Sequence, residues 1–195
     1  ELTVKVGDIA SVHMRINSWV PGNENCSGTI VADDGTVWTS SLPFLALGGE
    51  FLSFPYPSGL TAPINYDELV DPAPEAAYFT ATRSNHSYDF PMLPNGVYTI
   101  RIHFFDAGGE PRTMNYVVEG QTVLEGLSPS KNQADIMEVL VEVDDDNGLQ
   151  ITADEGTGSD VFESAIEIIG SPEAPPSVQF AARTQALCEG VRHTL

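Results

Sequence analysis

Five aromatic residues could stack on the apolar face of a sugar ring while nearby carboxylates and amides bond its hydroxyl groups. They are Trp19, Trp38, Tyr56, Tyr66 and Tyr78. Trp19 precedes a Pro-Gly turn, which favours exposure, whereas Trp38 follows a turn at the start of a strand-like segment and is expected in the core. Trp19, Tyr56 and Tyr78 are therefore the rings most available to a ligand.

Catalytic chemistry has weaker support. His103 and Asp106 are close in sequence, and Asp106 and Glu110 could pair as carboxylates. A hydrolase also needs a nucleophile or a second acid at fixed geometry, and no Gly-x-Ser-x-Gly elbow occurs. We expect no catalysis, and we expect Arg101 and His103 to make cross-strand pairs.

The run Asp144-Asp145-Asp146-Asn147-Gly148 is the best candidate for a calcium ligand set. It lacks the spacing and the later glutamate of a calcium-binding loop. A solvated acidic turn is the favoured interpretation and calcium the alternative; no other cofactor is predicted. The four histidines have no metal-ligand spacing, and with two cysteines a zinc site is not expected.

The charge balance limits the partners. The chain has 28 acidic and 8 basic residues and a net charge of -20, so it lacks the Lys/Arg clusters that bind nucleic acid or an anionic membrane. Its apolar runs are far shorter than the roughly 18 residues that cross a bilayer. The acidity is compatible with a soluble surface protein, with cation binding or with a salty habitat.

Two Asn-x-Ser sequons, at Asn25 and Asn85, favour a secreted glycoprotein. In that compartment Cys26 and Cys188 would pair, which would stabilise the fold by about 4 kcal/mol or more; an intracellular chain would leave them as thiols. The start shows no leader of the secretory type, so the leader has been removed or the sequence begins inside a longer protein. We expect an extracellular or cell-surface location.

Short strands separated by turns must position these residues. Val97–Phe105 alternates most clearly, with Tyr98, Ile100, Ile102 and Phe104 on one face and Thr99, Arg101, His103 and Phe105 on the other. Other strands are expected at 78–83, 87–92, 113–118, 121–124 and 162–169, and the segment 2–16 is extended, with Thr3, Val4 and Val6 before Gly7-Asp8. The pair 136–143 and 149–153 is predicted to form a hairpin through Asn147-Gly148. The fold class is an all-β jelly-roll sandwich of two antiparallel sheets.

Two segments interrupt this pattern. Residues 42–74 carry six prolines and three glycines, and they are predicted to form a long loop without a central strand or a long helix. Residues 171–177 are Pro-rich and predict a stiff linker. We therefore divide the chain into a sandwich domain at 1–170, the linker at 171–177 and a tail or docking segment at 178–195.

Six motifs, in order, resemble those of the malectin family, also known as carbohydrate-binding module family 57. The strongest is Asn95-Gly96-Val97-Tyr98-Thr99-Ile100-Arg101-Ile102-His103-Phe104. The others are Arg15-Ile16-Asn17, Asp34-Gly35-Thr36-Val37-Trp38, Tyr78-Phe79-Thr80-Ala81-Thr82-Arg83, the hairpin 115–121 and Ser164-Ala165-Ile166-Glu167-Ile168. Together they cover residues 12 to 170 and imply a jelly roll that binds glycans or mediates adhesion without catalysis.

The resemblance also implies a site built from loop aromatics and an acidic residue. Tyr78 occupies the place of one family tyrosine, and Asp160 loosely matches the acidic position. The family's aromatic pair would follow Asp106, yet the loop 107–110 here has no aromatic residue. Expected carbohydrate-binding residues are Trp19, Tyr56, Tyr78, Asp106 and Asp160.

The leading hypothesis is a non-catalytic carbohydrate-binding module of a secreted or cell-surface protein, with an oligosaccharide or a glycoprotein glycan as partner. The main alternative is a structural subunit domain of an extracellular filament, sheath or adhesin, whose partners are neighbouring copies reached through edge strands and the C-terminal tail. A third hypothesis is an accessory domain of a larger enzyme.

Overall fold

Twelve strands and two short 3₁₀ helices make up the part of the chain that the computed structural model describes, which is residues 12–18, 29–53, 63–67, 69–106, 113–128, 130–156 and 162–172. In chain order they are β1 (Val12–Asn17), β2 (Thr29–Val31), β3 (Val37–Ser40), η1 (Leu42–Phe44), β4 (Leu45–Ser53), η2 (Glu75–Phe79), β5 (Thr80–Phe90), β6 (Gly96–Phe105), β7 (Met114–Val118), β8 (Gln121–Leu127), β9 (Ala134–Val143), β10 (Leu149–Glu155), β11 (Phe162–Glu163) and β12 (Ala165–Pro172).

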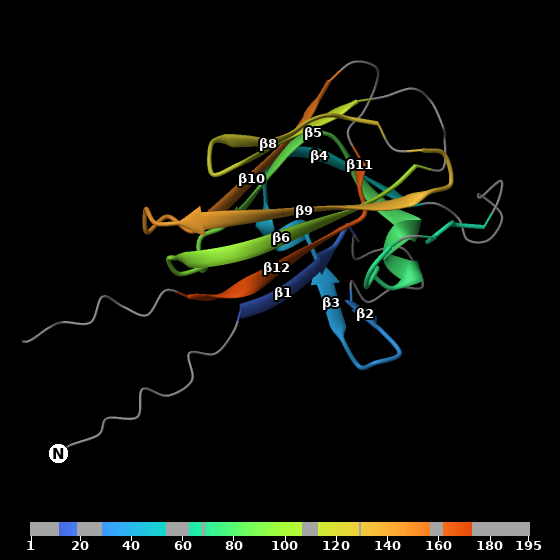
Figure 1. Cartoon of the computed structure of the whole chain (residues 1–195), viewed down its shortest axis with the longest axis horizontal. Helices are drawn as coiled ribbons and strands as arrows, with labels where there is room; N and C mark the ends of the chain where they lie inside the picture. Colours follow the sequence, from blue (N-terminus) through green and yellow to red (C-terminus); the bar gives the residue numbers. More distant parts are fainter. Residues whose placement is uncertain are drawn as a thin grey trace, which may run out of the picture.

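The strands form two sheets that face each other (Figure 1). The first has the order β2-β3-β1-β12-β6-β9, and the second has the order β11-β5-β10-β7-β8 with β4 paired to β5. Pairing is antiparallel except between β1 and β3. The predicted all-β sandwich is confirmed.

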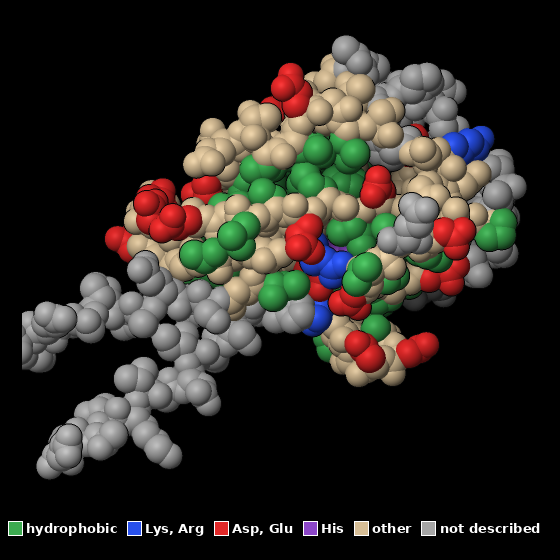
Figure 2. Space-filling view, in the orientation of Figure 1, with side chains coloured by type: hydrophobic (Ala, Val, Ile, Leu, Met, Phe, Trp, Pro, Cys, Tyr) green, Lys and Arg blue, Asp and Glu red, His purple; other side chains and the backbone are tan. Residues whose placement is uncertain are grey.

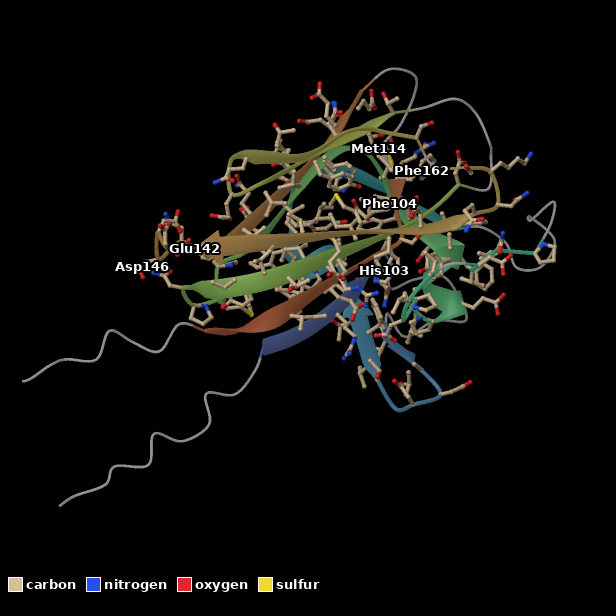
Figure 3. All side chains as sticks on the ribbon, viewed as in Figure 1. His103, Phe104, Met114, Glu142, Asp146 and Phe162 are labelled. Atoms are coloured by element: carbon tan, nitrogen blue, oxygen red, sulfur yellow. The ribbon has the colours of Figure 1, made fainter. Side chains whose placement is uncertain are left out.

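The alternation of β6 explains how the layers form. Its even-numbered residues Tyr98, Ile100, Ile102 and Phe104 are fully buried in the core between the sheets. Figure 3 shows Phe104 among Met114 and Phe162 in that space, whereas His103 lies on the other side of the strand. The odd-numbered side chains therefore occupy the outer face of the first sheet, as the sequence predicts.

A second apolar cluster lies on that outer face. It joins Trp38 of β3 and Phe105 of β6 to Ile64, Ala73 and Tyr78 of the segment that leads into β5. Trp38 is 3% exposed, so its expected core position is confirmed. The segment 63–79 covers one end of the first sheet because this cluster holds it there.

The predicted long loop at 42–74 is wrong in its first part, because β4 occupies residues 45–53 and pairs with β5. Gly48 and Gly49 have φ values of +66° and +80°, and the register shifts lie beside them. A Cβ on Gly48 would lie 2.1 Å from the Asn85 carbonyl oxygen. The glycines therefore mark bulges in an edge strand rather than a loop.

The predicted hairpin at residues 136–153 is also wrong. β9 pairs with β6 in the first sheet, while β10 pairs with β5 and β7 in the second. Residues 144–148 thus connect the two layers, and the positive φ values fall on Asp146 and Gly148 rather than on Asn147. A connection between the two sheets and a tight hairpin within one sheet both need residues with a positive φ. The sequence alone therefore does not distinguish the two structures.

Two strand boundaries differ from the sequence prediction. Residues 80–90 form the single strand β5, with Ser84 at φ +64°, instead of two strands. The predicted strand 162–169 divides at Ser164, so that β11 joins the second sheet and β12 the first. β12 runs to Pro172, which places the first two residues of the predicted linker in the sheet; the division of the chain at residues 170 and 177 stays a prediction.

Candidate functional site

Four charged residues stand directly opposite one another across the outer face of the first sheet. Arg15 of β1 faces Glu167 of β12, which faces Arg101 of β6, which faces Glu138 of β9. We call this row the charge ladder. Arg15 Nε lies 3.0 Å from Glu167 Oε2, Arg101 Nη1 2.8 Å from Glu167 Oε1, and Arg101 Nε 3.4 Å from Glu138 Oε2. The expected cross-strand pairing of Arg101 is confirmed.

His103 occupies the next outward position of β6 and is fully buried. Its Nε2 lies 3.1 Å from Glu167 Oε1, and its Nδ1 lies 3.1 Å from the Tyr78 hydroxyl and 3.4 Å from the Ala73 amide nitrogen. A carboxylate accepts and an amide donates, so the proton belongs on Nε2 and Nδ1 accepts. Burial lowers the pKa of His103, which agrees with a neutral ring that holds Tyr78 in place.

Arg101 also fixes the covering segment. Its Nη2 donates to the carbonyl oxygens of Val70 at 2.6 Å and of Asp71 at 3.0 Å. Asp71 has a φ of +53°, a left-handed conformation that is unfavourable for a residue with a Cβ. Its side chain is 84% exposed and its Oδ2 lies 3.6 Å from Arg101 Nη1. The buried guanidinium thus holds Asp71 at the surface above the ladder.

Two cavities lie on this face, and Asp71 lines both of them. The larger, here called the ladder groove, has a volume of about 890 Å³. It is lined by Asn65, Asp67, Leu69, Val70, Asp71, Thr99, Arg101, Gln133, Ala134, Asp135, Ile136, Glu138 and Ile169. The smaller, of about 490 Å³, lies towards β1 and β3 and includes Arg15, Trp38 and Glu167. Figure 2 shows basic side chains at the middle of this face with acidic ones around them.

The ladder groove can hold a polar ligand by hydrogen bonds. Four carboxylates and two side-chain amides line it with a single arginine, and Leu69, Ile136 and Ile169 add apolar surface. Its volume lies within the range of small-molecule sites. Because negative groups outnumber the guanidinium, a neutral polyhydroxylated molecule fits this lining better than an anion.

The structure buries two of the predicted carbohydrate-binding residues. Tyr78 is fully buried against His103 and Tyr66, at centroid distances of 6.1 and 5.5 Å, so its ring offers no face to a sugar. Asp106 is 3% exposed just after β6, where its backbone forms an isolated parallel β-bridge with Lys131 and its carbonyl oxygen accepts from the Asn132 amide. Both positions were predicted as ligand contacts; Tyr78 belongs to the outer-face cluster, and the backbone of Asp106 pairs with residues 131–132.

The other predicted site residues Trp19, Tyr56 and Asp160 lie outside the described residues, as do Cys26, Cys188 and Asn25. Asn85 is exposed on β5, and its Oδ1 accepts from the Glu155 amide at 2.7 Å. Its glycosylation stays a prediction.

Sequence reasoning missed the residues of the covering segment that line the groove. Asn65, Asp67 and Asp71 belong to the Pro-rich stretch that was predicted only as a loop, and no periodicity connects them to β6. The signal that was available is the outward position of Arg101 in the middle of a mainly apolar strand, because a buried guanidinium needs acidic partners.

A second buried polar cluster, separate from the charge ladder, surrounds Glu163 of β11. The carboxylate of Glu163, fully buried, lies 2.8 Å from His86 Nε2 and accepts from the hydroxyls of Tyr116 at 3.0 Å and of Tyr88. Ser18 donates to the Glu163 carbonyl oxygen. Neither of the two cavities described above is lined by Glu163, His86, Tyr88 or Tyr116, and we interpret this cluster as structural.

Within the described ranges no group of three or more His, Cys, Asp or Glu residues is arranged to hold a metal ion. In the acidic turn, Asp145 Oδ1 accepts from the Asn147 amide and Asp146 Oδ1 from Asn95 Nδ2. The calcium alternative for residues 144–148 therefore gains no support. No helix in the same ranges is long and apolar enough to cross a membrane.

Solved structures share this fold at low sequence identity. The plant receptor-like kinase ANX2 matches with a TM-score of 0.66 at 19% identity, over 84% of this chain and 51% of that chain. The ANX1 ectodomain from Arabidopsis thaliana gives a TM-score of 0.65 at 19% identity, over 84% and 51%. A Bacteroides uniformis β-glucuronidase gives 0.59 at 18% identity, over 82% of this chain but only 18% of that chain.

These neighbours support the malectin-like fold that the ordered motifs predict. No family model and no curated protein matches the chain by sequence. The chain spans about half the length of the ANX1 and ANX2 structures.

Proposed function

We propose that this chain is a non-catalytic carbohydrate-binding module of a secreted or cell-surface protein, and that the ladder groove is where it binds an oligosaccharide. The observation that carries the proposal is the lining of that groove, in which carboxylates, amides and one guanidinium surround apolar surface. Sugar hydroxyls both donate and accept, so this mixture of groups suits them. The likeness to receptor ectodomains supports an extracellular setting.

The polar groups of the groove are partly fixed before a ligand arrives. Arg101 is held by Glu167 and by the carbonyl oxygens of Val70 and Asp71, and Asp135 Oδ1 already accepts from the Ile136 amide. Fixed groups lose little conformational entropy when they bind. The excess of carboxylates predicts that neutral glycans bind and that uronic-acid or sialylated glycans bind less well.

A glycan array with neutral and acidic members tests this proposal, followed by calorimetry on the strongest neutral ligand. The double substitution Asp67→Asn and Glu138→Gln removes two charged acceptors from the groove and is expected to weaken binding at least tenfold, since hydrogen bonds to charged groups contribute about 1.5–3 kcal/mol each. Glu125→Gln is the matched control, because Glu125 is exposed on β8 in the other sheet.

Two results would contradict the proposal. One is the absence of binding to every glycan tested. The other is equal binding by the double variant and the Glu125→Gln control, which would place the ligand elsewhere, such as at the predicted rings of Trp19 and Tyr56.

A second candidate function is a structural subunit of an extracellular filament, sheath or adhesin. The specific observation in its favour is the long edge of the first sheet at β9, which in the described part of the chain pairs on one side only. Assembly through such an edge is compatible with glycan binding, since the ladder groove lies on the sheet face.

A further inference from the structure

Strand β9 is an edge of the first sheet and is unusually suited to accept another strand. It has ten residues, Ala134–Val143, and pairs with β6 in uninterrupted register. Natural edge strands are commonly protected by proline, charged side chains (lysine above all), bulges or a covering segment. β9 carries three acidic residues but neither proline nor lysine. Within the described residues only its first residue is covered, where the Ala134 amide donates to Asn65.

The hydrogen-bonding groups of this edge can be assigned. The Ala134 amide bonds to Asn65, and the Ile136 amide bonds to the Asp135 side chain, so neither points towards β6. Backbone direction alternates along an antiparallel strand. The amides and carbonyls of Glu138, Leu140 and Glu142 therefore face outward, ready to pair with an added strand.

An apolar seam runs beside the edge. The inward side chains Met137 and Val139 of β9 and Val123, Leu124 and Leu127 of β8 are only partly buried, although they pack against the core. β8 is the edge of the second sheet on the same side, and Figure 2 shows the hydrophobic patch between the positions that β8 and β9 occupy in Figure 1. An added strand with apolar residues at alternate positions would fill this seam.

We propose that the seam is the docking site for residues 1–11 of a second copy of this chain, which add to β9 as a further strand. The segment starts Glu1-Leu2-Thr3-Val4-Lys5-Val6, so Leu2, Val4 and Val6 share one side of a strand and Thr3 and Lys5 share the other. With the apolar side in the seam, Lys5 lies on the outer face with Glu138 and Glu142. Lys5 is one of two lysines in a chain of net charge -20.

Geometry favours a second copy over the same chain. Val12 stands level with Val141, through Gly170 and Tyr98, and three strands away from β9. Crossing to a strand beyond β9 takes four spacings, about 19 Å, and six fully extended residue steps reach about 20–22 Å, which leaves almost no length for a detour. β12 and β6 continue past the level of Val12. The chain's own N-terminal segment would therefore also have to pass across a face of the first sheet to reach β9.

Each copy gives a segment and receives one. The copies therefore form a dimer by reciprocal exchange, or a larger ring or an open filament by head-to-tail addition. The inference rests on the second candidate function.

Sedimentation velocity of the full chain over a wide concentration range tests the proposal. Leu140→Pro removes an outward amide without touching the bonds to β6, so it blocks the acceptor edge and is expected to give monomers. Val4→Asp with Val6→Asp places charges in the seam and blocks the donor segment, again giving monomers. Leu140→Thr and Thr3→Gln are the controls and are expected to assemble, and the thermal midpoint of each variant checks its folding.

The decisive arm mixes the two blocked variants. The Leu140→Pro chain keeps its donor segment and the Val4→Asp, Val6→Asp chain keeps its acceptor edge, so the mixture is expected to form a 1:1 dimer and nothing larger. A wild-type chain that stays monomeric would overturn this proposal together with the second candidate function. Assembly that persists in both blocked variants, or a mixture that stays monomeric, would overturn strand addition alone.

Discussion

Single buried charges carry much of the specificity of this sandwich. The Glu167 carboxylate binds Arg15, Arg101 and His103 on the outer face of the first sheet. The buried Glu163 carboxylate binds His86 and accepts from two tyrosine hydroxyls. Each carboxylate is at most 3% exposed, so each depends on its partners to offset the loss of water.

Glu163→Gln is expected to lower the free energy of unfolding by about 3 kcal/mol, since it leaves the buried donors of His86, Tyr88 and Tyr116 without their charged acceptor. Urea denaturation measures the change. Glu125→Gln, on the surface, should stay within about 0.5 kcal/mol of the wild type. Equal stabilities of these two variants would show that the cluster contributes nothing.

The contributions of the two buried histidines to stability are expected to change with pH in opposite directions. Burial by itself lowers the pKa of His86, but the Glu163 carboxylate and the hydrogen bonds to Glu163 and Ser84 raise it above its usual value. Its contribution to stability is therefore complete below about pH 6.5 and is lost as the pH rises through the folded-state pKa. Burial lowers the pKa of His103 despite Glu167, so its contribution is present above about pH 6.5 and is lost as the pH falls.

Urea denaturation of His86→Gln and His103→Gln across this pH range checks both signs. The destabilisation by His86→Gln should shrink as the pH rises, and that by His103→Gln should shrink as the pH falls, each by at most about 1.4 kcal/mol per pH unit. Parallel stability curves for wild type and variant would contradict the assignment for that histidine.

At the scale of elements, the connections decide the fold as much as the strands do. Residues 144–148 carry the chain from one sheet to the other, and Gly148 makes the crossing possible. It has a φ of +83°, and a Cβ there would lie 2.3 Å from the Phe90 carbonyl oxygen and 2.7 Å from Pro91 Cα. Position 148 thus requires glycine for two reasons: its positive φ, and the close approach of Phe90 and Pro91.

Gly148→Ala is therefore compared with Gly35→Ala. Gly35 has nearly the same φ, +85°, with nothing within 4 Å of its Cβ position. Gly35→Ala should cost about 1–2 kcal/mol from backbone strain alone, and Gly148→Ala should cost at least about 1–3 kcal/mol more from the clash. Thermal or urea unfolding measures both. Equal losses would mean that the chain avoids the contact with Phe90 and Pro91 at no cost.

Strands with alternating apolar residues could be predicted from the sequence, but the strands with which they pair could not. The alternation over residues 97–105 correctly predicts the two faces of β6, including the outward Arg101 and His103. β4 was missed because Gly48 and Gly49 are needed for bulges that only pairing with β5 creates. The groove was missed because tertiary packing alone brings Asp71 to Arg101 and Asp67 to the lining of the same groove. Tyr78 was predicted to be available to a ligand because the sequence does not reveal that its hydroxyl bonds to the buried His103.

At the scale of the whole molecule, negative charge dominates. The net charge of -20 produces self-repulsion that opposes the compact state. The two ladder pairs of Glu167, with Arg15 and with Arg101, are largely buried and are screened weakly by salt, whereas the surface repulsion is screened strongly.

Added salt is therefore expected to stabilise the protein. Raising NaCl from about 10 mM to about 1 M shortens the screening length from about 30 Å to about 3 Å, and the thermal midpoint should rise across this range. A falling midpoint would mean that exposed ion pairs, such as Arg83 with Glu50, outweigh the repulsion.

The most direct test of the central claim is to map a bound neutral oligosaccharide by NMR on the isotope-labelled chain. Backbone amide shifts are expected to concentrate at Thr99, Gln133, Glu138 and Ile169, which line the ladder groove, and to vanish in the Asp67→Asn, Glu138→Gln variant. Shifts confined to other surfaces, with these four amides unchanged, would contradict it.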